Sequence, residues 1–180
     1  MSRVRITGGE WRSRLIKVIE SPGLRPTPDR VRETLFNWLG QDMTGLRCLD
    51  LFAGTGILGF EAASRGAAKV VMVESDRRVA ANLWQNAETL GSDGMELVRA
   101  DALEFAALAA RQGRSFDLAF LDPPYRQHWL DKLWPLLLPI MAGGAKLYVE
   151  AEAVVAPPAP WRIVRQGQAG QVFFHLLERE

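Results

Sequence analysis

The feature that most constrains the fold is a regular alternation of short apolar runs and longer amphipathic segments between residues 48 and 150. The apolar runs predict strands, and the segments between them predict helices, the last of which Pro135 and Pro139 should bend or break. Strands separated by helices form a parallel sheet that is covered on both faces. The predicted strands are residues 48–52, 70–74, 97–100, 118–121 and 146–150, and the predicted helices are residues 57–65, 77–90, 103–111 and 129–141.

The end of the chain departs from this alternation. Residues 161–164 and 171–177 both have strand-like patterns, and only a short Gln- and Gly-rich segment separates them. Because no helical pattern lies between them, they should form an antiparallel hairpin. A parallel sheet that ends in such a hairpin is the arrangement of class I methyltransferases, not of the dinucleotide-binding dehydrogenases. The predicted fold class is therefore α/β, with a Rossmann-like, mostly parallel seven-stranded sheet and a terminal antiparallel hairpin.

The start of the chain differs from the remainder in charge. Residues 1–32 contain eight basic side chains, seven of them Arg, against three acidic ones, a net charge of +5. The whole chain carries +1, so the other 148 residues carry −4. Arginine pairs bidentately with phosphate and stacks on bases, which favours nucleic-acid binding over a merely solvated basic surface. The arginines that we select as RNA contacts are Arg12, Arg14, Arg25, Arg30 and Arg32.

The same N-terminal stretch has its own predicted elements. Residues 3–7 and 15–19 read as a short strand pair. A helix should follow and run to Leu39, with Thr27 as its N-cap and Pro28 at its first position. We therefore expect a basic N-terminal extension, residues 1–40, attached to a methyltransferase domain, residues 41–180.

The cysteine, histidine and hydropathy patterns bear on disulfides, metal sites and cellular location. A single cysteine, Cys48, excludes an internal disulfide and should be a buried core residue. The N-terminus lacks a signal-peptide pattern and no apolar run could span a membrane, so a cytoplasmic protein is expected. His128 and His175 lie 47 residues apart without cysteine or histidine partners, so no metal site is expected. A monomer is the expected state, with His175 structural and His128 at the surface.

A glycine turn, Asp50-Leu51-Phe52-Ala53-Gly54-Thr55-Gly56, ends the first strand of the alternation. Its glycines let a ligand approach the backbone at the carboxyl end of a strand, and amides of the following helix suit a ligand carboxylate. Gly54, Gly56 and Gly59 also match the dinucleotide fingerprint, so an NAD-dependent oxidoreductase remains open on this motif. Against it, Asp50 would lie awkwardly beside a pyrophosphate but comfortably near an amino-acid ammonium. This detail favours S-adenosylmethionine.

Acidic residues at two later strand ends extend the predicted cofactor site. Glu74, 18 residues beyond Gly56, can accept hydrogen bonds from both ribose hydroxyls of either cofactor. Asp101 can accept from an adenine amino group while the Ala102 amide donates to a ring nitrogen; a plain helix cap at Asp101 is an equal alternative. The predicted cofactor-binding residues are Asp50, Phe52, Ala53, Gly54, Thr55, Gly56, Glu74, Asp101 and Ala102.

A second motif, Asp122-Pro123-Pro124-Tyr125, ends the fourth strand 66 residues after Gly56. An amine attached to an aromatic ring is a poor nucleophile because its lone pair is delocalised. The Asp122 carboxylate and the Pro123 carbonyl can accept both N–H groups and point the lone pair at a sulfonium methyl, while proline fixes the backbone. Tyr125 can stack on the base, which contributes about 1–3 kcal/mol. Asp-Pro is common in plain turns, but after a cofactor turn it favours catalysis by Asp122, Pro123, Pro124 and Tyr125.

Over nearly its whole length the chain resembles the RsmD family of bacterial 16S ribosomal RNA guanine-N2 methyltransferases. Residues 6–15 (ITGGEWRSRL) and 24–39 (LRPTPDRVRETLFNWL) carry the most distinctive similarity, whereas the two site motifs are shared with other amine methyltransferases. The family often has Phe where this chain has Tyr125. The resemblance implies that S-adenosylmethionine is the cofactor. It further implies methylation of guanine N2 at position 966 of 16S RNA, in the small subunit or an assembly intermediate.

Other functions remain open on the residues alone. Asp-Pro-Pro-Tyr serves DNA adenine-N6 methylation equally well, and a non-catalytic RNA-binding or assembly factor would also use the basic extension. Protein glutamine methyltransferases normally begin this motif with Asn, whereas this chain has Asp122. Between Gly56 and Asp122 there is no room for the separate target-recognition domain of many DNA amine methyltransferases. RNA is therefore favoured over DNA.

Overall fold

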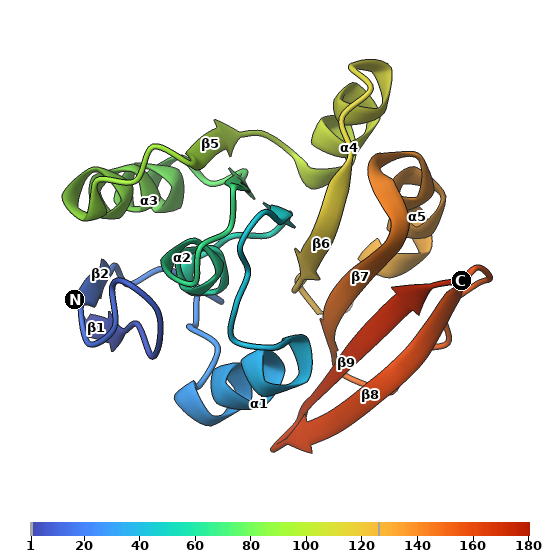
Figure 1. Ribbon diagram of the computed structural model, residues 1–180, viewed down its shortest axis with the longest axis horizontal. Helices are drawn as coiled ribbons and strands as arrows, with labels where there is room; N and C mark the ends of the chain where they lie inside the picture. Colours follow the sequence, from blue (N-terminus) through green and yellow to red (C-terminus); the bar gives the residue numbers. More distant parts are fainter. Residues whose placement is uncertain (1, 126) are drawn as a thin grey trace.

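The computed structural model describes residues 2–125 and 127–180, which are built around a central seven-stranded sheet (Figure 1). The sheet strands are β3 (Arg47–Asp50), β4 (Lys69–Glu74), β5 (Met95–Arg99), β6 (Phe116–Leu121), β7 (Met141–Ala151), β8 (Trp161–Ala169) and β9 (Val172–Arg179). The helices are α1 (Asp29–Leu39), α2 (Ile57–Ser64), α3 (Arg77–Leu90), α4 (Ala102–Arg111) and α5 (Trp129–Leu137), which continues into a 3₁₀ turn, η1 (Leu138–Ile140). None of these helices is long and apolar enough to cross a membrane.

The strand order confirms the predicted fold class. The strands lie in the order β5-β4-β3-β6-β7-β9-β8, and the five from β5 to β7 are parallel. β9 lies between β7 and β8 and runs antiparallel to both, as expected for the terminal hairpin. The chain moves outward from β3 to β5 and then returns to β6 on the other side of β3. The carboxyl ends of β3 and β6 therefore flank a topological switch point, where open α/β sheets bind ligands.

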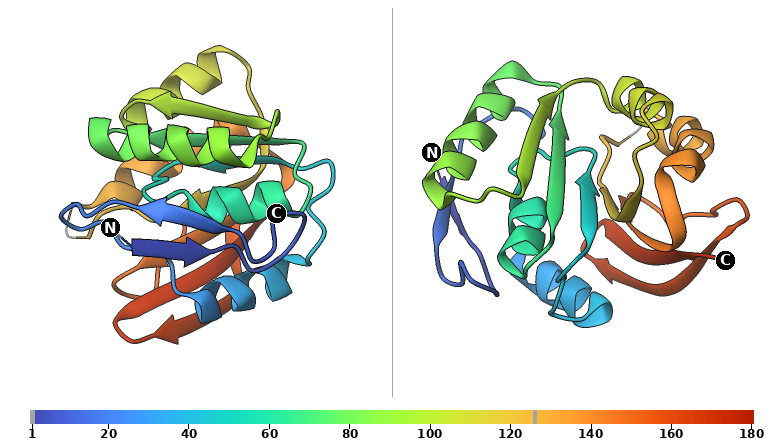
Figure 2. Two further views of the ribbon diagram at one scale, coloured as in Figure 1. Left: turned by 90° about the vertical axis from the view of Figure 1, so that its left-hand side faces the viewer. Right: turned by 45° about the horizontal axis from the view of Figure 1, so that its top comes forward.

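Each face of the sheet has its own core because side chains alternate along a strand. Cys48, Phe120 and Tyr148 point to the face that α1, α2 and α3 cover. Their chain neighbours Leu49 and Leu121 point to the opposite face, with α4 and α5. Figure 2 shows the two groups of helices on opposite sides of the sheet. Burial raises the pKa of the Cys48 thiol to about 12, which confirms it as an inert core residue.

The predicted strand pair at the N-terminus is confirmed as β1 (Ser2–Arg5) and β2 (Leu15–Val18), an antiparallel pair outside the main sheet. Its connecting loop packs on α2, where the Ser64 carbonyl accepts from the Glu10 amide at 2.7 Å. Gly9 has φ +78°, and a Cβ there would lie 2.0 Å from the Ser64 oxygen, so no side chain fits. Three residues of this part join the core on the α1–α3 face: Ile6, Trp11 and Ile16. The extension is thus continuous with the body of the protein.

Two predicted helix boundaries are wrong. Thr27 does not cap α1: the helix follows Pro28 without a side-chain cap, and the Thr27 hydroxyl donates instead to Glu150, 123 residues away. The last predicted helix should reach residue 141, but α5 ends at Leu137. The predicted break near Pro139 is confirmed, because a 3₁₀ turn, η1, contains this proline. Pro135, in contrast, lies inside α5. A tertiary contact overrides the cap at Thr27, and the proline near the end of the segment, which lacks an amide donor, ends the α-helix.

Candidate functional site

The glycine turn lies at the carboxyl end of β3, as predicted. Gly54 and Gly56 have φ values of +56° and +83°, which L side chains rarely adopt. At Gly56 an added Cβ would lie 2.3 Å from the Leu83 side chain and 2.7 Å from the Phe60 ring, so packing also requires glycine. The turn leads directly into α2, whose first residue is Ile57. The amino end of α2 therefore lies at the ligand-binding edge of the sheet.

Glu74 stabilises this turn through hydrogen bonds. One of its carboxylate oxygens accepts from the Gly54 amide at 3.0 Å, and the other accepts from the Asp76 amide at 2.8 Å. Asp76 in turn caps α3 through the Val79 amide. Glu74 therefore shapes the cofactor loop in the protein itself. Its predicted hydrogen bonds to a ribose remain a prediction.

Asp50 is buried at the same edge. Its Oδ2 has no hydrogen-bond partner in the described part of the chain, although buried polar atoms normally have one. Burial raises the pKa of Asp50 to about 7, the Gly59 amide hydrogen bond opposes this, and the negative charges of Glu74 and Glu150 add to it. An unpaired acceptor beside a glycine turn suits a cationic group of a ligand. This Asp50 oxygen therefore fits the predicted amino-acid ammonium of S-adenosylmethionine.

Other predicted cofactor residues have structural contacts. Asp101 caps α4, because its Oδ1 accepts from the Leu103 and Glu104 amides at 2.9 and 3.1 Å. The helix-cap alternative is thus confirmed, and the adenine contact stays a prediction for this residue and Ala102. The Thr55 hydroxyl accepts from the Ile57 amide at 3.3 Å. No group of three or more His, Cys, Asp or Glu within residues 2–125 and 127–180 could hold a metal ion.

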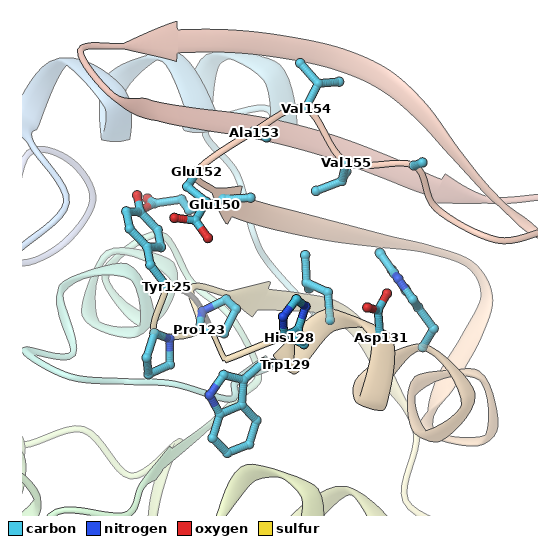
Figure 3. A pocket seen from close by; sticks show the side chains of 15 residues that line it. Pro123, Tyr125, His128, Trp129, Asp131, Glu150, Glu152, Ala153, Val154 and Val155 are labelled. Atoms are coloured by element: carbon cyan, nitrogen blue, oxygen red, sulfur yellow. The ribbon is translucent and has the colours of Figure 1, made fainter.

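The Asp-Pro-Pro-Tyr motif lies beside a cavity of about 300 Å³ at the end of β6 (Figure 3). Pro123, Pro124 and Tyr125 line one side, and residues 150–156 line another. In Figure 3 the Tyr125 side chain extends toward the strand end that carries Glu150 and Glu152. Tyr125 is 41% exposed, so its ring is available to a planar ligand. The volume lies at the lower end of the range for ligand pockets and suits a single nucleobase.

The cavity residues that the sequence analysis does not select include Trp129, Trp134 and Glu150. Trp129 packs edge-on against Phe52 of the glycine turn, with ring centroids 5.3 Å apart. This contact links the predicted cofactor loop to the wall of the cavity. Glu150 could have been found from the sequence, because it is an acidic residue at the end of a predicted strand. Glu74 is selected on the same feature. Trp129 and Trp134 lie on α5, and the sequence pattern does not predict which parts of the protein this helix contacts.

Asp122 follows β6, which lies in the sheet between β3, which precedes the glycine turn, and β7, which carries Glu150. Burial raises the pKa of its carboxyl group well above the ordinary value, and the negative charge of Glu150 and a hydrogen bond with it act in the same direction. Asp50 adds a smaller effect of the same sign. The site thus gathers three carboxyl groups in a largely dry environment.

The predicted RNA-contacting arginines divide into two kinds. Four of them are exposed: Arg12, Arg14, Arg25 and Arg30. The fifth, Arg32, is fully buried, and its guanidinium contacts Glu61 at 2.9 Å, Asp29 at 2.8 Å and the carbonyls of Thr27 and Arg5. The prediction is wrong for Arg32, because its donors are already engaged inside the protein.

His175 is structural, as predicted, and supports the cavity wall. The buried ring contacts the Val149 carbonyl through Nδ1 at 3.0 Å, and its Nε2 accepts from the Val155 amide at 3.2 Å. These two contacts need the neutral ring, with the proton on Nδ1. Burial lowers the pKa of His175. Val155 lines the cavity, so this ring holds part of the cavity wall in place.

Acidification should therefore weaken the fold through His175. Its pKa is lower in the folded than in the unfolded protein, so its contribution is complete above about pH 6.5 and is lost as the pH falls further. We expect the free energy of unfolding in urea to fall less between pH 7.5 and 5.5 in His175→Asn than in the wild type. His128→Asn, at an exposed position, is the control. In this variant the free energy of unfolding should change with pH as steeply as in the wild type. Equal slopes in the wild type and His175→Asn would contradict the assignment.

Comparisons with known proteins agree with this architecture. The family model described as "Conserved hypothetical protein 95" matches residues 4–178. Ribosomal RNA small subunit methyltransferase D of Escherichia coli (strain K12) is 43% identical over 99% of this chain and 91% of its own length. The protein of that name from Haemophilus influenzae is 40% identical over 97% of this chain and 93% of its own length. The solved structure of yhhF from Escherichia coli is similar with a TM-score of 0.89 and 43% identity, over 99% of each chain. This chain therefore belongs to that family, the RsmD family, and has the class I methyltransferase fold.

Proposed function

We propose that this protein transfers a methyl group from S-adenosylmethionine to the exocyclic N2 of a guanine in 16S ribosomal RNA. The acceptor would be the base at position 966, in the small subunit or an assembly intermediate. The observation that carries the proposal is the base-sized cavity beside the Asp-Pro-Pro-Tyr turn, whose wall residue Trp129 packs against Phe52 of the glycine turn. The membership of the RsmD family supports ribosomal RNA as the substrate. We further propose that it acts as a cytoplasmic monomer.

When bound, S-adenosylmethionine supplies a methyl group on a positively charged sulfur. The residues of the chain position the cofactor and the guanine amine relative to each other. The glycine turn and Asp50 hold the amino-acid end of the cofactor, while an Asp122 oxygen and the Pro123 carbonyl accept the two hydrogens of the guanine N2. The nitrogen lone pair then faces the methyl carbon. Transfer would form the N–C bond as the S–C bond of the cofactor breaks, with that electron pair left on sulfur, and the nitrogen would release one proton to water.

The target base must leave its stack to reach Asp122, which directly precedes the cavity residues Pro123, Pro124 and Tyr125. Unstacking costs a few kcal/mol and costs least for a base in a loop. The exposed Tyr125 ring can replace part of this stacking. Residues 1–40 would act as the RNA-contacting extension of the domain formed by residues 41–180.

Labelled methyl transfer to three acceptors tests the proposal: small subunits that lack the modification, naked 16S RNA and duplex DNA. We expect labelled N2-methylguanine from a ribosomal acceptor and no label in DNA. Label confined to N6-methyladenine in duplex DNA would refute the proposal. Transfer to none of the three, despite binding of the cofactor, would also refute it and leave the fold unaffected.

The exposed arginines give a separate prediction. Arg25→Ala combined with Arg30→Ala should weaken RNA binding and lower the steepness of its salt dependence by about 0.7 for each phosphate that the protein no longer neutralises. Affinity for S-adenosylmethionine should not change, since neither residue lies at the glycine turn. RNA affinity is measured at several salt concentrations, with exposed Arg111→Ala on α4 as the control. Unchanged RNA affinity in the double variant would assign these arginines to an inert surface.

A further inference from the structure

The end of β7 places a second carboxyl group beside the catalytic one. β6 and β7 are parallel neighbours with Leu121 opposite Val149, so Asp122 and Glu150 occupy the next position on adjacent strands. Leu121 and Val149 both belong to the core on the α4–α5 face. Alternation along the strands therefore directs the side chains at 122 and 150 to the other face. The two carboxyl groups meet there through a hydrogen bond.

Glu150 is held in place by two hydroxyl groups. Only 6% of the residue is exposed, and its Oε1 accepts from the Tyr148 hydroxyl at 2.7 Å and from the Thr27 hydroxyl at 3.1 Å. Tyr148 lies on the same strand, while Thr27 belongs to the segment that leads into α1. Two hydroxyl donors on one oxygen leave the second oxygen of Glu150 to face Asp122. A hydrogen bond between two carboxyl groups requires one proton between them.

We propose that Glu150 is a positioning residue for Asp122: its carboxylate accepts a hydrogen bond from the Asp122 carboxyl group and so turns the other Asp122 oxygen toward the substrate nitrogen. This inference rests on the proposed function. In this arrangement Asp122 works as a neutral acid. Its O–H donates to Glu150, its carbonyl oxygen accepts one N–H of the amine, and the Pro123 carbonyl accepts the other.

The electrostatics of the site favour the same protonation. Burial and the negative charge of Glu150 raise the pKa of Asp122 well above its ordinary value. A neutral acid offers the same pattern as an amide, one donor and one acceptor, so Asp122→Asn should preserve both contacts. Among residues 2–125 and 127–180, the other ionisable groups around the pair are Asp50 on β3, Tyr148 on β7, Tyr125 after β6, Glu152 after β7, and the cavity residues His128 and Asp131.

The pH dependence of kcat tests this role. In the wild type, kcat should fall as the pH rises through the ionisation of Asp122, because the carboxylate repels Glu150. Asp122→Asn should keep kcat within about tenfold of the wild type and lose the alkaline fall. Glu150→Gln should lower kcat by about 10²-fold, as a misplaced reactive group does, with KM for RNA unchanged. The alkaline fall should disappear in this variant, because Gln carries no charge that could repel the Asp122 carboxylate. Wild-type kcat in Glu150→Gln, or an alkaline fall that persists in Asp122→Asn, would overturn the inference.

A measurement independent of activity separates this inference from the proposed function. Carbon-13 NMR titration follows the Asp122 carboxyl in the wild type, in Glu150→Gln and in Glu152→Gln, which removes a negative charge from the cavity wall beyond Glu150. The pKa of Asp122 should fall in Glu150→Gln and remain unchanged in Glu152→Gln. An unchanged value in Glu150→Gln refutes the role of Glu150, whatever the substrate. The expected titration in a wild type that methylates no ribosomal acceptor refutes the proposed function alone. If Glu150→Gln does not fold, Tyr148→Phe, which removes one of the two hydroxyl donors, should give the same changes at smaller size.

Discussion

Asp122→Ala should lower kcat for methyl transfer by about 10²–10³-fold and leave the affinity for S-adenosylmethionine unchanged. Alanine removes the side-chain oxygen that holds one amine hydrogen, while the glycine turn and Glu74 remain intact. The interaction that alanine removes orients the amine in the transition state, so the effect should appear in kcat more than in KM. Single-turnover transfer of labelled methyl measures the chemical step, and calorimetric titration measures cofactor binding.

Two matched variants sharpen this experiment. Asp117 is the second residue of the same strand, β6, near its amino end, where it pairs with Arg47 at 3.1 Å. Asp117→Ala should keep kcat at the wild-type level. Asp122→Asn, which retains an acceptor oxygen, should lie well above Asp122→Ala. Wild-type transfer by Asp122→Ala would remove the motif from catalysis and favour a non-catalytic RNA-binding or assembly factor.

The parts of this fold that could be predicted depend on local pattern. The alternation of apolar runs and helical segments predicts the parallel strands because burial on both faces makes most residues of such a strand apolar. The glycine turn and the Asp-Pro-Pro-Tyr motif are also local, since their backbone geometry is set by adjacent residues. Their meeting at one edge follows from the parallel arrangement, which places successive strand ends together.

Contacts between distant segments could not be predicted in the same way. Thr27 has the residue type and position of an N-cap, but a buried carboxylate 123 residues away takes its hydroxyl. Arg30 and Arg32 look alike in the sequence, yet residues two apart on a helix point in nearly opposite directions. The buried residues of α1 are Val31, Arg32, Leu35 and Phe36, so the helical spacing of its apolar residues could have marked Arg32 as inward-facing.

Glu61→Ala should lower the free energy of unfolding by about 3–5 kcal/mol, because it leaves buried charges without a partner. Glu61 is fully buried on α2, between the guanidinium groups of Arg32 at 2.9 Å and Arg65 at 2.7 Å. It also accepts from the Thr7 amide and hydroxyl at 2.8–3.1 Å. One carboxylate thus joins the segment after β1, α1 and α2. Urea unfolding followed by circular dichroism measures the loss of stability.

Asp29→Ala is the matched control, since Asp29 also contacts Arg32 but its side chain is 64% exposed. An exposed ion pair contributes at most about 1 kcal/mol, so this variant should remain close to the wild type. A destabilisation of Glu61→Ala as small as that of Asp29→Ala would show that water reaches the two arginines. Because Glu61 holds Thr7 and Arg32 to α2, partial unfolding of Glu61→Ala should begin in residues 1–40. Limited proteolysis in mild urea should then cleave that segment first, and methyl transfer to RNA should disappear before cofactor binding does.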